Sequence, residues 1–173
     1  MGLRSGVSMK LYLIRHGIAA LREDYTNDEE RPLTDKGRKK TAQVAKQLYD
    51  RGLRFDVILT SPLVRAKETA VILQKAGLAA NVEEFTPLAP DGDIEAWVNW
   101  LKQRWQKDTS DQSLALVGHQ PDLGNWAETL VWGNAQEKLI LKKAGVIGIK
   151  VPDAQPPIGQ SELFLLTSPK WLL

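Results

Sequence analysis

Two histidines, the only two in the 173 residues, each come soon after a short apolar run of the chain. Residues 10–14 lead into His16 through one arginine, and residues 114–117 lead into His119 through one glycine. Short apolar runs predict buried strands, and open α/β sheets bind ligands beyond the carboxyl ends of their strands. We therefore expect both imidazole rings to face one crevice at the edge of a sheet.

Two arginines complete a set of residues that suits a phosphoryl group. Arg15 directly precedes His16, and Arg65 falls in the first turn of a helix predicted to follow a strand at residues 57–59. Guanidinium groups stay charged and match phosphate oxygens in bidentate fashion. A cation at the amino end of a helix also indicates an anion nearby. One neutral imidazole can carry a phosphoryl group covalently, while the other, when protonated, can stabilise its oxygens.

A glycine adjoins each histidine, at Gly17 and Gly118. Glycine lets the backbone approach a ligand closely, so we expect Gly17 to bind the substrate together with Arg15, Arg65 and His119. An isolated histidine at a strand end is more often structural than catalytic. Two histidines grouped with two arginines and two glycines favour a functional site.

Strands and helices alternate along most of the chain. Further strands are expected at residues 57–59 and 81–85, and residues 145–151 and 162–167 predict a hairpin. Helices are expected after capping signals at Thr34, at Ser61 with Pro62 and at Asp93, and again at residues 120–131; the third carries an apolar stripe of Ile94, Trp97, Val98, Leu101 and Trp105. The alternation predicts an α/β fold, a three-layer α-β-α sandwich whose mostly parallel central sheet has an antiparallel edge. The long polar segment 18–32 is either a lid or a plain connection.

Length and composition limit the class of protein. A chain of 173 residues suits one domain, which we expect at residues 9–173 behind a flexible extension at residues 1–8. The net charge of +2 argues against a nucleic-acid-binding face, and the absence of cysteine excludes thiol nucleophiles and thiolate metal sites. No apolar run reaches the ~20 residues of a membrane helix, and residues 1–8 lack the apolar stretch of a secretory signal. We expect a cytoplasmic protein that does not contact membranes and is a monomer or a weak homodimer.

The residues around both histidines resemble the histidine phosphatase superfamily, also called the phosphoglycerate mutase-like family. The resemblance rests on four blocks in the family's order: Leu13-Ile14-Arg15-His16-Gly17, Arg31-Pro32-Leu33-Thr34 with Gly37, Ser61-Pro62 with Arg65-Ala66 and Thr69-Ala70, and Val117-Gly118-His119-Gln120-Pro121. It implies a phosphoglycerate mutase-like fold and a metal-independent phosphatase without an organic cofactor. It also implies that His16 is the phosphorylated nucleophile, in a pocket for phosphate or sulfate completed by Arg15, Arg65 and His119.

Two departures from the wider family concern the substrate. Residues 18–21 are Ile-Ala-Ala-Leu where mutases and phosphomonoesterases usually have a serine and an asparagine, and Glu83 and Glu84 lie only near the place of their proton-donating glutamate. An alkoxide leaving group needs a general acid, whereas a phosphorylated imidazole leaves more easily. Ala19 and residues 88–93 resemble the small SixA-like phosphohistidine phosphatases. That resemblance implies a phosphohistidine-bearing protein, of the phosphotransfer-domain type, as the substrate.

Two other functions stand beside this one. A small-molecule phosphomonoesterase or mutase of the same superfamily would need a proton donor near residues 83–93, where Glu83 and Glu84 are the possible donors. A non-catalytic phosphate-binding module would keep the pocket and need no nucleophile. The presence of all four pocket residues favours an enzyme that acts through phospho-His16.

Overall fold

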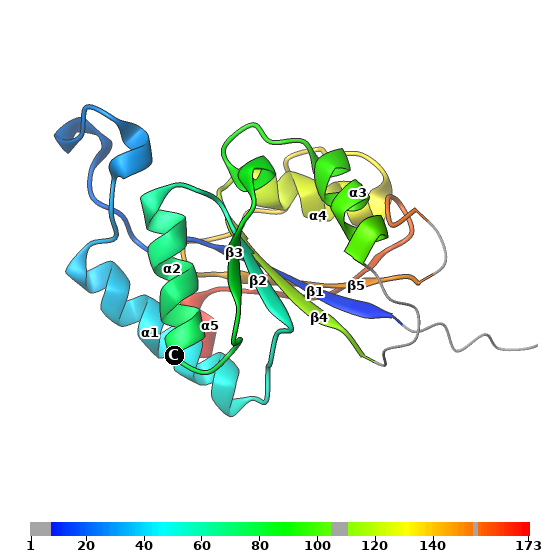
Figure 1. Cartoon of the computed structure of the whole chain (residues 1–173), viewed down its shortest axis with the longest axis horizontal. Coiled ribbons are helices and arrows are strands. Elements are labelled where there is room, and N and C mark those ends of the chain that lie inside the picture. Colours follow the sequence, from blue (N-terminus) through cyan, green and yellow to red (C-terminus); the bar gives the residue numbers. More distant parts are fainter. Residues whose placement is uncertain (1–7, 105–110, 154–155) are drawn as a thin grey trace, which may run out of the picture.

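A six-stranded sheet crosses the protein in the order β3-β2-β4-β1-β5-β6. The computed structural model describes residues 8–104, 111–153 and 156–173 (Figure 1). Strands β1 to β4 pair in parallel, and β5 and β6 continue the sheet as an antiparallel hairpin. The strands are β1 (Met9–Arg15), β2 (Val57–Thr60), β3 (Val82–Glu84), β4 (Ser113–Gly118), β5 (Val146–Val151) and β6 (Glu162–Thr167). The predicted mostly parallel sheet with an antiparallel edge is confirmed.

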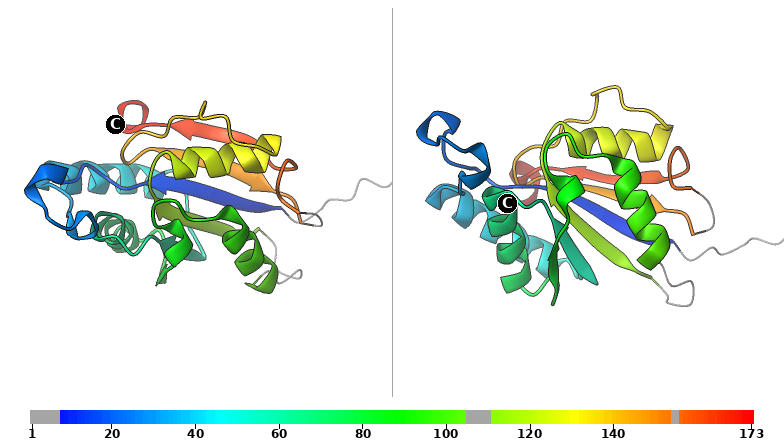
Figure 2. Two further views of the ribbon diagram at one scale, coloured as in Figure 1. Left: turned by 90° about the horizontal axis from the view of Figure 1, so that it is seen from above. Right: turned by 45° about the horizontal axis from the view of Figure 1, so that its top comes forward.

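Helices cover both faces of the sheet and make the predicted three layers (Figures 1 and 2). Helices α1, α2 and α5 lie on one face, and α3 and α4 on the other. The described helices are α1 (Asp35–Asp50), α2 (Val64–Lys75), α3 (Ile94–Arg104), α4 (Asp122–Trp132), α5 (Pro169–Leu172) and the short 3-10 turn η3 (Thr86–Leu88). None of them is long and apolar enough to span a bilayer.

The central strand β1 shows why these residues form a doubly covered sheet. Successive side chains of a strand point to opposite faces. Leu11 and Leu13 pack in the core under α3 and α4, while Tyr12 and Ile14 pack in the core under α1 and α2. Because both faces are buried, the strand is apolar from Leu11 to Ile14, and the residues that follow it lie at the carboxyl edge of the sheet.

The first two predicted helix caps have different outcomes. The Thr34 hydroxyl accepts a hydrogen bond from the N–H of Gly37 at 2.9 Å, as expected of the cap of α1. The predicted start of α2 at Ser61 and Pro62 is wrong, because this helix begins at Val64. The Ser61 hydroxyl accepts from the N–H of Leu63 at 3.2 Å instead, and so stabilises a turn that precedes the helix.

Residues 18–32 are organised rather than irregular. Two 3-10 turns, η1 (Arg22–Asp24) and η2 (Asp28–Glu30), shape the segment, and a bridge between Ala19 and Leu33 closes its base. It projects beyond the carboxyl ends of the parallel strands (Figure 1). Residues 1–7 of the extension predicted at residues 1–8 lie outside the described residues, and so does Trp105 of the predicted apolar stripe. Trp97 of that stripe is fully buried.

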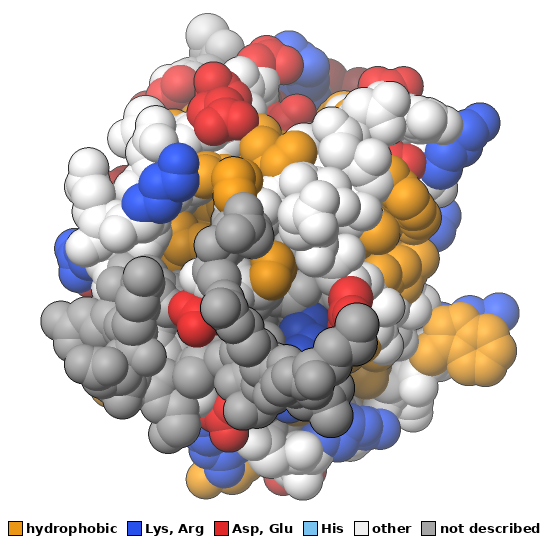
Figure 3. Space-filling model, turned by 90° about the vertical axis from the view of Figure 1, so that its right-hand side faces the viewer, with side chains coloured by type: hydrophobic (Ala, Val, Ile, Leu, Met, Phe, Trp, Pro, Cys, Tyr) orange, Lys and Arg blue, Asp and Glu red, His pale blue; other side chains and the backbone are white. Residues whose placement is uncertain are grey.

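The opposite end of the protein carries the amino ends of the parallel strands. In the described part of the face seen in Figure 3, acidic and basic side chains are mixed with separate hydrophobic groups, and no histidine side chain is visible. His16 and His119 follow the last residues of β1 and β4, which places them at the carboxyl edge, the other end of the sheet.

Candidate active site

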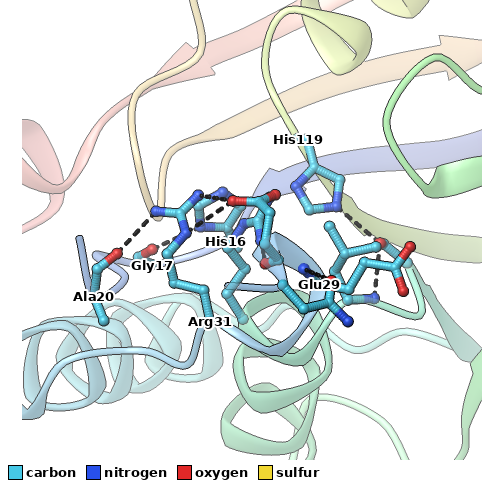
Figure 4. A network of polar contacts seen from close by, with 11 residues as sticks. His16, Gly17, Ala20, Glu29, Arg31 and His119 are labelled. Carbon is cyan, nitrogen blue, oxygen red and sulfur yellow. Dashed lines mark hydrogen bonds and ion pairs between the residues drawn. The ribbon is translucent and has the colours of Figure 1, made fainter. Parts of the chain in front are cut away.

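His16 and His119 lie side by side at that carboxyl edge. They follow β1 and β4, which are parallel neighbours. The N–H of His16 donates to the carbonyl of Gly118 at 3.1 Å. The ring centroids are 5.2 Å apart, and both residues are only 5% exposed (Figure 4). The structure thus brings the two histidines into one buried pair.

A single hydrogen bond sets the orientation of the His16 ring. Its Nδ1 lies 2.7 Å from the carbonyl oxygen of Gly17. Because a carbonyl oxygen only accepts hydrogen bonds, Nδ1 carries the proton and Nε2 keeps a free lone pair. The N–H of Gly17 donates to the Thr69 hydroxyl at 3.0 Å. Gly17 was expected to bind substrate; in this structure its N–H donates to Thr69 and its carbonyl oxygen accepts from His16, and its contact with substrate stays a prediction.

Burial keeps both histidines neutral. It lowers the pKa of His16 to about 3 against the opposing effect of the hydrogen bond to Gly17, and the charges of His119, Arg65 and Arg15 add smaller contributions in the same direction as burial. Burial also lowers the pKa of His119 to about 4, helped by the charges of Arg65 and Arg15. A neutral His16 is what a nucleophile requires. His119 is neutral as well near pH 7, so in the ligand-free protein it is a hydrogen-bond donor rather than the cation considered above.

These lowered pKa values predict a loss of stability on acidification. Between pH 6.5 and about 4 the unfolded chain binds protons on both histidines while the folded chain does not, and for His16 this difference continues down to about pH 3. The stabilisation is therefore complete above pH 6.5 and is lost as the pH falls, by at most about 1.4 kcal/mol per pH unit for each histidine. Urea unfolding of the wild type and of a His16→Gln/His119→Gln variant at pH 7.5, 6 and 5 measures this term. The variant should show a flatter pH dependence, and equal slopes would contradict the prediction.

Ser61 is a site residue that the sequence reasoning used only as a helix cap. It is fully buried, and its hydroxyl oxygen lies 2.8 Å from Nε2 of His119. That oxygen already accepts from the N–H of Leu63, so the hydroxyl proton is free to donate to Nε2. In this arrangement Nδ1 of His119 carries the ring proton, and this buried nitrogen has no hydrogen-bond partner.

Three buried N–H groups without a partner belong to the predicted pocket residues. They are Nε of Arg15, Nε of Arg65 and Nδ1 of His119, and they make up half of the six unpaired buried side-chain atoms found in the described residues. Buried donors are nearly always paired. The terminal Nη1 of Arg15 is held by the Leu141 carbonyl at 3.0 Å, which fixes that guanidinium. An oxyanion bound next to His16 would supply the missing partners for these nitrogen atoms of Arg15, Arg65 and His119.

The acidic segment 27–30 reaches the site through Asp28. Arg65, itself 4% exposed, donates to the Asp28 carbonyl at 2.8 Å and to the Asp28 carboxylate at 3.0 Å. Arg31 contacts the other carboxylate oxygen at 3.1 Å and donates to the Ala20 carbonyl. Burial tends to raise the pKa of Asp28, but the charges of Arg65 and Arg31 outweigh it and hold that pKa below its ordinary value. The ionised Asp28 thus binds the two terminal nitrogens of Arg65, Nη1 and Nη2, and leaves its Nε without a partner.

The two possible proton donors named from the sequence are engaged elsewhere. Glu83 pairs with Arg104 at 3.6 Å and lines a hollow at the amino ends of the strands. Glu84 pairs with Lys67 at 2.7 Å. Neither has a contact with a histidine in the described structure. No group of three histidine, aspartate or glutamate side chains that could hold a metal ion occurs among the residues described here.

Comparison with known proteins places this site in a family. The histidine phosphatase superfamily (branch 1) model matches residues 11–88. The chain is 29% identical over 120 residues to the phosphohistidine phosphatase SixA of Escherichia coli K12, covering 67% of this chain and 70% of that protein. It is 52% identical over 166 residues to an uncharacterized protein of Picosynechococcus sp., covering 95% of this chain and 99% of that relative. The resemblance of this chain to the histidine phosphatase superfamily is confirmed.

Solved structures share the fold of this chain. The structure of the protein histidine phosphatase SixA complexed with tungstate superposes with a TM-score of 0.82 at 23% identity, over 95% of this chain and all of that one. A phosphoglycerate mutase from Plasmodium falciparum superposes with a TM-score of 0.61 at 18% identity, over 92% and 90% of the two chains. The predicted phosphoglycerate mutase-like fold and the resemblance to the SixA-like branch are both confirmed.

Proposed function

We propose that this protein is a phosphohistidine phosphatase that acts on a phosphorylated protein through phospho-His16. The observation that carries the proposal is the buried, neutral His16 with a free Nε2, paired with His119 in a site where Arg15, Arg65 and His119 each keep a buried nitrogen without a partner. Nε2 attacks phosphorus, the phosphorus–nitrogen bond of the substrate breaks, and the substrate imidazole leaves with the electron pair and takes up a proton. Arg15, Arg65 and His119 stabilise the phosphoryl oxygens in this step. Water then attacks phospho-His16 and releases phosphate, which restores the neutral imidazole.

The carboxyl groups around the site favour a phosphorus–nitrogen substrate. The Asp28 carboxylate is ionised and held by two arginines, so it is a poor proton donor. Glu83 and Glu84 are bound to basic side chains away from the histidines. A phosphohistidine substrate tolerates this, since an imidazole leaves without the strong general acid that an alkoxide needs. The similarity to SixA, a phosphohistidine phosphatase, supports the same choice.

One observation favours the alternative of a phosphomonoesterase. Burial raises the pKa of Asp122, three residues after His119, and its carboxylate accepts from the N–H of Asp91 at 2.8 Å. A carboxyl group with a raised pKa suits a general acid. In that alternative, Asp122→Asn would lower the hydrolysis of phosphomonoesters. In the phosphohistidine mechanism, the same variant would leave phosphohistidine hydrolysis nearly unchanged.

A substrate panel separates these functions. The substrates are a phosphorylated histidine phosphotransfer domain, phosphoramidate, phosphoserine, 3-phosphoglycerate and p-nitrophenyl phosphate, and the enzymes are wild type, Asp122→Asn and, for background, His16→Ala. We expect kcat/KM for the phosphorylated domain to exceed that for every monoester by about 100-fold or more, a gap of roughly 2.7 kcal/mol in transition-state binding. Equal or faster hydrolysis of a monoester would reject the proposal. If the wild type hydrolysed none of the substrates, the protein would be a phosphate-binding module instead of an enzyme.

The proposed mechanism is also metal-independent, because the stabilising charges are side chains of this protein. Activity in the panel should therefore survive prolonged incubation with EDTA. A loss of activity that is restored by adding a divalent cation would contradict this part of the proposal.

A further inference from the structure

A basic hollow adjoins the active site on the side of α1 and α5. It has a volume of about 580 Å³ and lies between the first half of α1, the segment before β5 and the start of α5. Its cationic lining residues are Arg15, Lys40, Lys142, Lys143 and Lys170. No aspartate or glutamate is among the described residues that line it. By its sequence, the run Arg38-Lys39-Lys40 is typical of a solvated helix face; the structure places Lys40 in this hollow.

The charge of the basic hollow is not neutralised by the protein itself. Across the described parts of the chain, none of its four lysines forms an ion pair. Lys142, Lys143 and Lys170 are exposed. A second, adjacent hollow on α1 is lined by Lys36, Lys39 and Lys40 with one glutamine, so the positive region continues along the helix. Clustered like charges with few counter-charges attract anionic partners and speed their association.

Arg15 connects the basic hollow to the catalytic site. It lines the hollow, and it directly precedes His16, with its Nε buried and unpaired. A ligand whose phosphoryl group reaches His16 therefore has this basic surface beside it. On the projecting segment 18–32 the charge is opposite, since Glu23, Asp24, Glu29 and Glu30 are all exposed there. An acidic protein surface is therefore attracted to the basic hollow and repelled by segment 18–32.

We propose that the basic hollow docks acidic side chains of the substrate protein next to its phosphohistidine, which gives Lys142, Lys143 and Lys170 a role in substrate recognition. This inference rests on the proposed function and names a feature of its substrate. The pocket at His16 is sufficient for a phosphoryl group alone, whereas a folded substrate protein also brings a surface up to the entrance. Complementary charge on that surface sets its orientation and raises its rate of association.

The test compares two triple variants with the same change in net charge. The first is Lys142→Gln/Lys143→Gln/Lys170→Gln. The control is Lys10→Gln/Lys102→Gln/Lys150→Gln, whose lysines are also exposed but do not line the hollow. Each enzyme is assayed with a phosphorylated histidine phosphotransfer domain of acidic surface and with phosphoramidate, at 20 and 300 mM NaCl. Circular dichroism and thermal unfolding verify that the variants fold like the wild type.

We expect the first variant to lose about tenfold or more in kcat/KM toward the phosphorylated domain at low salt. Its activity should depend less on salt than that of the wild type, because screening already removes the same attraction at high salt. Its kcat/KM for phosphoramidate should stay within about twofold of wild type, as should both activities of the control.

Three outcomes would overturn the docking proposal. One is unchanged kcat/KM of the first variant toward the phosphorylated domain. Another is an equal loss with phosphoramidate, which would mean that the lysines act on the pocket and not on a protein surface. The third is an equal loss in the control, which would mean that only net charge matters. Failure of the proposed function looks different, because the wild type itself would then not dephosphorylate the domain while still hydrolysing a monoester.

Discussion

Replacement of His16 by alanine is expected to abolish the phosphoenzyme and to lower kcat/KM by roughly 10⁴-fold or more. The variant keeps Arg15, Arg65 and His119, so the phosphoryl group still finds its donors. It lacks the lone pair at Nε2 that forms the covalent bond. Incubation with ³²P-labelled phosphoramidate, followed by rapid alkaline quenching, should trap a label on wild type that is lost in acid. The alanine variant should show no such label.

The presence of only two histidines makes this experiment easy to interpret. Any acid-labile label that persists in His16→Ala would have to sit on His119, and it would reverse the two roles. The matched control is His119→Ala, which removes an N–H donor from the pocket but leaves the nucleophile. We expect that variant to become labelled on His16 more slowly, by about 10²- to 10³-fold, as when an oxyanion-hole donor is removed. Full activity of His16→Ala would end the covalent mechanism.

The sequence predicted the sheet and its chemistry because both depend on local signals. Residues 10–14 and 114–117 are apolar throughout apart from Lys10, which is typical of strands buried on both faces. Parallel strands share a carboxyl edge, so residues that follow them meet even when they are 103 positions apart, as His16 and His119 are. No knowledge of side-chain conformation was needed for that step.

The sequence did not predict the partners that orient these residues, because those contacts are set by tertiary packing. Asp28 meets Arg65 across 37 positions, and Ser61 meets His119 across 58. The position of Arg65 in the first turn of a helix did indicate an anion nearby. In the structure one such anion is the Asp28 carboxylate, which offsets the unfavourable helix dipole while the unpaired Nε of Arg65 stays available.

The two possible proton donors of the alternative function show a second limit of the sequence. Glu83 and Glu84 lie at the end of a strand as predicted, yet successive residues of a strand point to opposite faces. Glu83 turns to Arg104 on the α3 side and Glu84 to Lys67 on α2. Their pairing depends on basic residues of two different helices, which sequence spacing does not reveal.

Gly17→Ala is expected to be strongly destabilising, by about 2–4 kcal/mol, and to inactivate the protein. A Cβ at this position would overlap the Thr41 hydroxyl oxygen. Relief requires Thr41 to change its side-chain conformation or the backbone to move, and a shift of the backbone displaces the Gly17 carbonyl that orients His16. Urea unfolding measures the first effect, and the rate with phosphoramidate measures the second.

Thr41→Ala supplies the matched test, because it removes the atom that the new Cβ at position 17 would strike. The Thr41 hydroxyl is buried without a partner, so its loss offsets the loss of a methyl group and the single variant should stay within about 1 kcal/mol of wild type. In the double variant the new Cβ would next meet the Gly37 carbonyl at 3.4 Å and Leu33 at 3.5 Å, which are ordinary contacts. We therefore expect Thr41→Ala to restore most of the stability and activity lost in Gly17→Ala. If the losses of stability in the two single variants simply added in the double variant, the glycine would be needed for a reason other than the overlap with the Thr41 hydroxyl.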